Sequence, residues 1–134
     1  MKLLYTNFHS GSGGGHTTYI RELARGLSAR HEVHVAAPEE SRLLREAREI
    51  PGLHAFAQTY PNGLRLRPAR RRACSRLRAY LEVHRFDIVH VNGSADHRLV
   101  IAALRGLQPR PLVVLTKHNT KPMRGLQHAW RARF

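Results

Sequence analysis

The sequence has 134 residues, of which 42% are hydrophobic and 24% are charged, so it fits one globular domain of ordinary size. This composition excludes a collagen-like chain and a disordered chain. No apolar run approaches the roughly 20 residues that cross a bilayer, and the opening residues lack the long apolar stretch of a secretion signal. Cys74 is the sole cysteine, which excludes an internal disulfide and favours a reducing, cytoplasmic location.

Charge is the extreme feature of the composition. The 23 Lys and Arg residues outnumber the 9 Asp and Glu residues, and the formal net charge is +14. A positive field of this size attracts phosphate groups, whether on nucleotides, nucleic acids or anionic lipids. A GC-rich genome also enriches arginine, so the excess alone assigns no function.

Short apolar runs alternate with amphipathic stretches along the chain. Apolar side chains three and four residues apart predict helices, and short apolar runs between turn residues predict strands. Asp96 is expected to be the N-cap of its helix. In chain order the sequence predicts a strand at 2–8, a helix at 15–30, a strand at 32–37, a helix at 39–49, a strand at 53–58, a helix at 68–83, a strand at 86–91, a helix at 96–107, a strand at 112–116 and a helix at 122–133.

This alternation predicts an α/β fold, a Rossmann-like doubly wound parallel sheet with right-handed crossovers. We expect the strand order 3-2-1-4-5. Ligands of such a sheet bind beyond the carboxyl ends of its strands, at the point where the strand order reverses. That rule selects three loops, at 8–17, 92–98 and 117–121.

The first of these loops is rich in glycine. Glycines allow a positive φ and let a ligand approach the backbone, and the N-terminus of the following helix favours phosphate. The loop does not match the dinucleotide fingerprint G-x-G-x-x-G, because the place of the last glycine is taken by His16 when counted from Gly11, or by Thr18 when counted from Gly13. It is not a P-loop either, because no Gly-Lys-Ser/Thr follows. A flexible loop without a ligand is the alternative.

Three segments carry a family resemblance. The first is the glycine loop with its helix, GGGHTTYIRELARGL at 13–27. The second is FDIVHVN at 86–92, and the third is VVLTKHNT at 113–120. In this order and at this spacing, they resemble the N-terminal domain of a family 4 (group 1) glycosyltransferase of the GT-B fold.

The resemblance implies an enzyme with two Rossmann-like domains around a cleft, in which the C-terminal domain holds most of the nucleotide-sugar donor. We therefore expect residues 1–134 to be a single, truncated, acceptor-side domain without its C-terminal donor domain. The implied activity is retaining transfer of a sugar to a glycan or lipid-linked acceptor, in bacterial envelope polysaccharide synthesis of the lipopolysaccharide type. It implies no metal ion and no other cofactor.

The resemblance also assigns roles to single residues. Gly14 and Gly15 match the glycines that approach the donor phosphate. His16 and Thr17 match loop positions on the acceptor side, and His118 matches the histidine beside the reacting sugar. His118 also follows a predicted buried strand, where it could donate a hydrogen bond to a sugar hydroxyl or to the transition state. A surface-loop histidine is the alternative.

Further polar residues of the same loops are candidates for acceptor binding. They are Asn119, beside His118, and the pair Asp96 and His97, which a helix cap with a neighbouring histidine explains equally well. The sequence has 10 histidines, but no H-x-x-x-H or C-x-x-C spacing supports the roughly four converging ligands of zinc. We therefore expect no metal site.

Segment 65–85 concentrates arginine on a predicted helix. A basic amphipathic helix can lie on an anionic membrane surface, and related enzymes with lipid-linked acceptors often use this region in that way. The expected membrane contacts are Arg70, Arg71, Arg72, Arg76 and Arg78. A solvated helix face packed by its leucines is the alternative. Nucleic acid is not an expected partner, because no helix-turn-helix, RNA-recognition or zinc-finger pattern accompanies the charge.

Two other functions stay open at this point. One is a non-enzymatic, flavodoxin-like module that binds a nucleotide or a phosphate group. The other is a basic protein that binds membranes or RNA. A second α/β domain with an E-x7-E pattern beyond residue 134 would favour the transferase.

Overall fold

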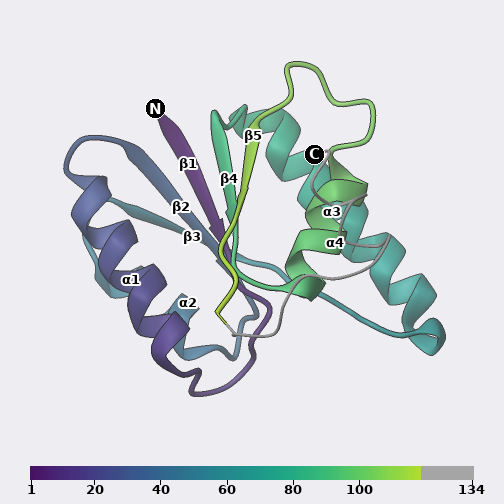
Figure 1. Cartoon of the computed structure of the whole chain (residues 1–134), viewed down its shortest axis with the longest axis horizontal. Helices are drawn as coiled ribbons and strands as arrows, with labels where there is room; N and C mark the ends of the chain where they lie inside the picture. Colours follow the sequence, from purple (N-terminus) through teal and green to yellow (C-terminus); the bar gives the residue numbers. More distant parts are fainter. Residues whose placement is uncertain (119–134) are drawn as a thin grey trace.

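The computed structural model describes residues 1–118, which form one parallel sheet between two layers of helices (Figure 1). The strand order is β3-β2-β1-β4-β5, as the sequence predicted. The elements in chain order are β1 (Lys2–Thr6), α1 (Gly15–Ser28), β2 (Glu32–Ala37), α2 (Arg42–Glu49), β3 (Leu53–Ala57), the 3-10 turn η1 (Leu64–Leu66), α3 (Arg67–His84), β4 (Ile88–Val91), α4 (Ser94–Ala103) and β5 (Leu112–Leu115).

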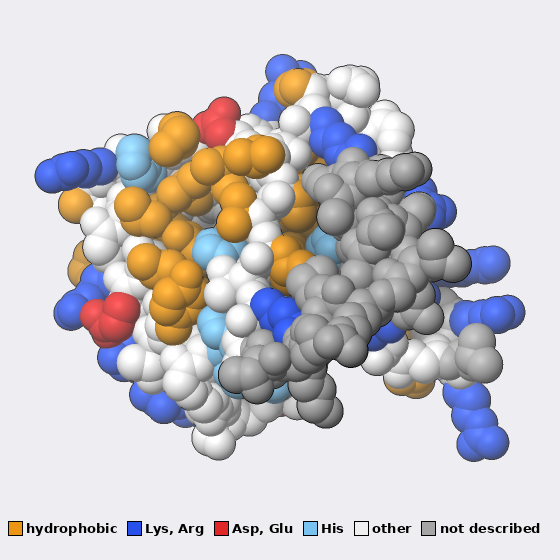
Figure 2. Space-filling model, viewed as in Figure 1, with side chains coloured by type: hydrophobic (Ala, Val, Ile, Leu, Met, Phe, Trp, Pro, Cys, Tyr) orange, Lys and Arg blue, Asp and Glu red, His pale blue; other side chains and the backbone are white. Residues whose placement is uncertain are grey.

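The helices divide between the two faces of the sheet (Figure 1). Successive strand residues point to opposite faces, so β1 sends Leu3 and Tyr5 into the core under α1 and α2, and Leu4 into the core under α3 and α4. On β5, Leu112 and Val114 stay exposed, and hydrophobic side chains gather on the face seen in Figure 2. Among residues 1–118, no helix combines the length and the apolarity that a membrane crossing needs.

Two helix starts differ from the sequence prediction. The second helix starts at Arg42 rather than near 39, because the Ser41 side chain accepts a hydrogen bond from the Leu44 amide and caps it. The prediction that Asp96 is an N-cap is wrong. Gly93 is the N-cap, and Asp96 lies at the third helical position, from which its carboxylate reaches back to the Asn92 amide. The helix predicted at 122–133 lies outside the described residues.

The sheet brings three loops to one edge. Thr6 of β1 pairs in register with Val91 of β4, which pairs with Leu115 of β5. The loops that follow these strands therefore leave the sheet side by side. The strand order reverses between β1 and β4, so this edge holds the ligand-binding position of a doubly wound sheet.

Candidate functional site

The three loops meet at His118, which follows β5. The His118 ring lies 5.4 Å from the ring of His16 at the start of α1, and 5.3 Å from the ring of Tyr19 one turn further along that helix. His118 Nε2 is 3.2 Å from the side-chain oxygen of Asn92, directly after β4. Residues from the first, fourth and fifth strand ends thus form one cluster, as the predicted topology requires.

Asn92 fixes how His118 is presented. Its side chain is buried, and its amide nitrogen donates to the backbone carbonyls of Thr6, at 3.1 Å, and His90, at 3.3 Å. The amide oxygen therefore faces His118 and can only accept, so His118 carries its proton on Nε2. In the neutral ring this leaves Nδ1 with a lone pair that can accept a hydrogen bond.

Three histidine rings follow one another along this edge. The His9 ring lies 4.2 Å from His16, which in turn neighbours His118. Partial burial lowers the pKa of His9, and so do the nearby His16 and His118. Burial and then His16 lower the pKa of His118. At neutral pH both rings are therefore neutral hydrogen-bonding groups.

The glycine loop contains two kinds of glycine. Gly13 has a φ of +65°, and a Cβ there would lie 2.0 Å from the Thr17 hydroxyl oxygen, so the fold itself requires glycine. Gly14 is the extended N-cap of α1, and the nearest atom to a Cβ there is 3.7 Å away, on His16. A Cβ on Gly15 would have nothing within 4 Å. The described fold therefore has no need for glycine at 14 and 15, and their missing side chains leave the helix N-terminus open.

Other predicted acceptor-binding residues lie deeper. Thr17 is buried under the loop, and Asp96 and His97 are buried in the first turn of α4. Asp96 accepts hydrogen bonds from the Thr6 hydroxyl and the Asn92 amide, both at 2.8 Å, and so ties β1 to the loop after β4. Burial raises the pKa of Asp96 to about 6, although these two hydrogen bonds act in the opposite direction. Asn119 lies outside the described residues.

Sequence reasoning missed two members of this edge. Asn92 is the last residue of the segment FDIVHVN at 86–92, but from the sequence we assigned it no role. An Asn-Gly pair directly after a buried strand is the signal that could have identified it as a site residue. Gly93 is extended, with a φ of −171°, and a Cβ there would lie 2.3 Å from the Phe8 ring. Glycine is needed at 93 because Phe8, after β1, packs against its backbone.

The predicted membrane arginines lie on α3. Arg70, Arg71, Arg72 and Arg76 are exposed, and basic side chains project from the molecule in Figure 2. Arg78 differs, because it bonds to Glu82 and to the carbonyl oxygens of Ala103 and Arg105 at the end of α4. It joins the two helices. Of the other four exposed arginines, Arg76 places its guanidinium over the Phe56 ring, 5.1 Å from the ring centroid.

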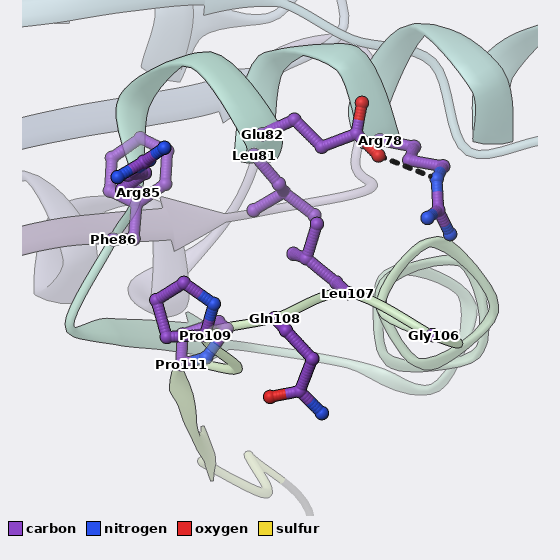
Figure 3. A pocket seen from close by; sticks show the side chains of 10 residues that line it. All are labelled: Arg78, Leu81, Glu82, Arg85, Phe86, Gly106, Leu107, Gln108, Pro109 and Pro111. Carbon is purple, nitrogen blue, oxygen red and sulfur yellow. Dashed lines mark hydrogen bonds and ion pairs between the residues drawn. The ribbon is translucent and has the colours of Figure 1, made fainter.

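A cavity of about 360 Å³ lies between the end of α3 and the loop before β5 (Figure 3). Its lining includes Arg78, Arg85 and Leu107, and also Phe86 and Pro111, which precede β4 and β5. It therefore opens at the amino edge of the sheet, opposite His118.

Comparison with known proteins places the chain in a family. The family model of Glycosyltransferase Family 4 matches residues 13–134, which include Gly13, Gly14 and Gly15, the ends of β4 and β5, and His118. A search among curated proteins found no match. Because the family match extends over far more than half of the sequence, the chain belongs to Glycosyltransferase Family 4.

Proposed function

We propose that this chain is the acceptor-side, N-terminal part of a retaining glycosyltransferase. It moves a sugar from a nucleotide-sugar donor to a glycan or a lipid-linked acceptor, in bacterial envelope polysaccharide synthesis of the lipopolysaccharide type. The observation that carries this proposal is the convergence of His118, His16 and the open N-terminus of α1 at the edge where the strand order reverses.

The open helix N-terminus suits the donor diphosphate. Backbone N–H groups and the positive end of the helix dipole favour phosphate there, and Gly14 and Gly15 let the oxygens come close. We place the reacting sugar next to His118. With Nε2–H held by Asn92, the neutral ring offers Nδ1 as an acceptor for a sugar hydroxyl. From the sequence we expected His118 to donate a hydrogen bond to the sugar. The contact with Asn92 instead favours a ring that accepts a hydrogen bond from the sugar.

The buried residues act through those that reach the surface. Asp96 and Thr6 hold the backbone at Asn92, and Asn92 orients His118. We propose that His16 and Asn119 contact the acceptor, and that Thr17 shapes the loop from below. The transfer chemistry that we propose uses no metal ion.

The exposed arginines of α3 are proposed to rest on the inner face of the plasma membrane. A protein that works on a lipid-linked acceptor gains from such a surface, because it holds enzyme and acceptor in one plane. The protein would then be cytoplasmic and peripheral, with no membrane-crossing segment needed for attachment.

The test is a transfer assay on the full-length protein and on residues 1–134 alone, with a panel of nucleotide sugars and with release of nucleoside diphosphate as the readout. We expect transfer by the full-length protein and none by the isolated chain, because catalysis needs donor and acceptor held together. Transfer by the isolated chain at the full-length rate would contradict the two-domain proposal. Nucleotide binding without any transfer would favour a non-enzymatic binding module.

A further inference from the structure

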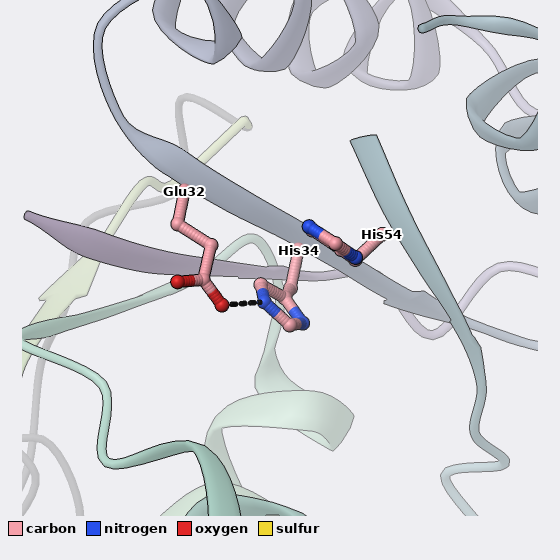
Figure 4. Close-up of side chains that lie close together, drawn as sticks. All are labelled: Glu32, His34 and His54. Atoms are coloured by element: carbon pink, nitrogen blue, oxygen red, sulfur yellow. Dashed lines mark hydrogen bonds and ion pairs between the residues drawn. The ribbon is translucent and has the colours of Figure 1, made fainter. Parts of the chain in front are cut away.

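A second cluster of chemically active side chains lies away from His118. Glu32 and His34 lie on β2, two residues apart and therefore on one face of the sheet. His54 on the neighbouring strand β3 pairs in register with His34. Figure 4 shows the three side chains together, with Glu32 and His34 joined by a hydrogen bond.

The three side chains converge closely enough to share one ion. Their ligand atoms all lie within 4.8 Å of one another, and His34 Nε2 is 2.9 Å from the nearer Glu32 oxygen. A tetrahedral zinc site, with bonds of about 2.0–2.2 Å, holds its ligand atoms about 3.3–3.6 Å apart. The His54 ring stacks on His34, with ring centroids 4.5 Å apart, so it must turn out of this stack to reach a shared ion. Glu32 and His54 are exposed and therefore free to make this adjustment, while the buried His34 stays in place.

Neighbouring groups hold His34 in position. Its Nδ1 shares a hydrogen bond with the Tyr80 hydroxyl, and Tyr80 stacks on Phe56 with ring centroids 3.8 Å apart. A hydroxyl can accept as well as donate, so Nδ1 can carry the ring proton while Nε2 binds an ion. Metal-binding histidines commonly have such a partner on the second nitrogen, which fixes the ring. His84, at the end of α3, also packs near His34, at 4.7 Å between ring centroids.

We propose that Glu32, His34 and His54 form a binding site for a divalent transition-metal ion, with zinc as the best match to two imidazoles and one carboxylate. Solvent completes the coordination, because the site is open on the side of Glu32 and His54. The ion clamps β3, an edge strand, to β2. It lies toward the opposite end of β2 from the sheet edge that holds His118, the proposed catalytic edge, so it stabilises the fold and takes no part in transfer.

One cation already competes for this site. Lys2 Nζ lies 3.1 Å from the same Glu32 oxygen that contacts His34. An incoming metal ion must displace this ammonium group or bind through the other carboxylate oxygen. Removal of the Lys2 charge should therefore tighten metal binding, which a merely adventitious surface histidine site would not show.

The experiment titrates the metal-free chain with ZnCl2 by calorimetry, and with Co²⁺ by visible absorption. We expect one equivalent to bind, with Co²⁺ bands typical of tetrahedral coordination. Saturating zinc should raise the Tm by about 5 °C, and EDTA should reverse the rise. His54→Ala and Glu32→Gln should each weaken binding at least about tenfold, and Lys2→Met should strengthen it severalfold.

Histidines elsewhere provide the controls. His31→Ala removes a histidine outside both clusters, and His16→Ala removes one from the catalytic edge. Both variants should bind zinc like the unaltered chain. Equal binding by His54→Ala and the unaltered chain would overturn the proposal. It would also fail if His16→Ala alone abolished binding, or if 1 equivalent of zinc left both the heat signal and the Tm unchanged.

Discussion

Single residues decide what the proposed catalytic edge can offer to a substrate. Asn92 points its amide nitrogen at two backbone carbonyls, so only its oxygen is available to His118. This arrangement selects one tautomer of the histidine and one ring orientation. The exposed side of the ring is then a hydrogen-bond acceptor at neutral pH, because burial and His16 lower the pKa of His118.

The first prediction concerns His118. In the proposed two-domain enzyme, His118→Ala should lower kcat by about 10²- to 10³-fold, the usual loss when one directed transition-state hydrogen bond is removed. The donor KM should change much less, because the interaction strengthens in the transition state. Steady-state kinetics and thermal melts measure both effects. His118 is exposed, so the Tm should hardly move.

The control for His118 is His31→Ala, because His31 directly precedes β2 and so lies at the amino edge of the sheet, opposite His118. It should leave kcat and KM unchanged. A His118→Ala enzyme with near-normal kcat would remove this residue from the mechanism. Loss of activity together with unfolding would indicate a structural role.

The glycines of the loop give a second prediction. Gly15→Ala should keep the Tm, because a Cβ there meets nothing within 4 Å and alanine favours a helix. It should raise the donor KM, because the methyl group occupies the proposed phosphate position. Gly13→Ala should instead destabilise the protein by about 1–2 kcal/mol or more, because of its positive φ and the overlap with Thr17. Thermal melts and donor kinetics on the two variants distinguish an effect on donor binding from an effect on the stability of the fold. Similar losses of stability in both variants would contradict this distinction.

Helix α3 shows how one element can serve two purposes. Ala73, Leu77 and Leu81 face the core, and Arg78 joins α3 to the end of α4, so this side builds the fold. Arg70, Arg71 and Arg72 lie near the start of the helix and are exposed. The two sides can therefore be tested separately.

A charge reversal on α3 is the third prediction. The triple variant Arg70→Glu/Arg71→Glu/Arg72→Glu should bind anionic vesicles at least about 100-fold more weakly, at roughly 1 kcal/mol per arginine near the surface. Co-sedimentation with anionic and neutral vesicles at two salt concentrations measures this. A matched triple reversal at Arg25, Arg30 and Arg45, on the opposite side of the sheet, should have a small effect. Equal losses in both triple variants would show that net charge, and not α3, drives binding. Tighter salt-dependent binding to RNA than to vesicles would favour the RNA-binding alternative.

The sequence predicted most elements but few of the contacts between them. All five strands, their order and the three carboxyl-end loops followed from apolar runs and from the rules of parallel topology. The burial of Asp96 and His97 did not, because the helical period cannot tell which polar side chain a loop will cover. The pairing of His34 with His54 depends on strand register, so no spacing within one strand could indicate a metal site.

At the scale of the whole molecule, burying a carboxyl group makes stability depend on pH. The pKa of Asp96 is raised from 3.8 to about 6 in the folded state, so its contribution is fully present below pH 4 and is lost as pH rises through 6. That loss amounts to about 3 kcal/mol. Asparagine keeps the acceptor oxygen for Thr6 and the Asn92 amide but carries no charge.

The fourth prediction follows for Asp96→Asn. Its free energy of unfolding, relative to the unaltered chain, should increase by about 2 kcal/mol between pH 4.5 and pH 7.5, because part of the loss has already occurred below pH 4.5. Denaturant unfolding at several pH values measures this difference, and effects of the histidines cancel because both proteins share them. A difference that stays constant with pH would show that Asp96 titrates alike in the folded and unfolded states.

The central place of β1 in the sheet has a consequence for the order of events on the ribosome. β1 is synthesised before the other strands of the sheet, and it can pair with β2 as soon as residues 32–37 emerge, but its second neighbour is β4, with Leu3 opposite Ile88. Until β4 has emerged, one edge of β1 stays open to water and to other chains. Leu4, which packs beneath α3 in the folded protein, stays exposed as well. Closing so long a loop costs only slightly more entropy than closing a short one, but such distant pairings slow folding. The nascent chain therefore has a stage in which a central strand is paired along only one edge, and a chaperone that shields strand edges would act at that stage.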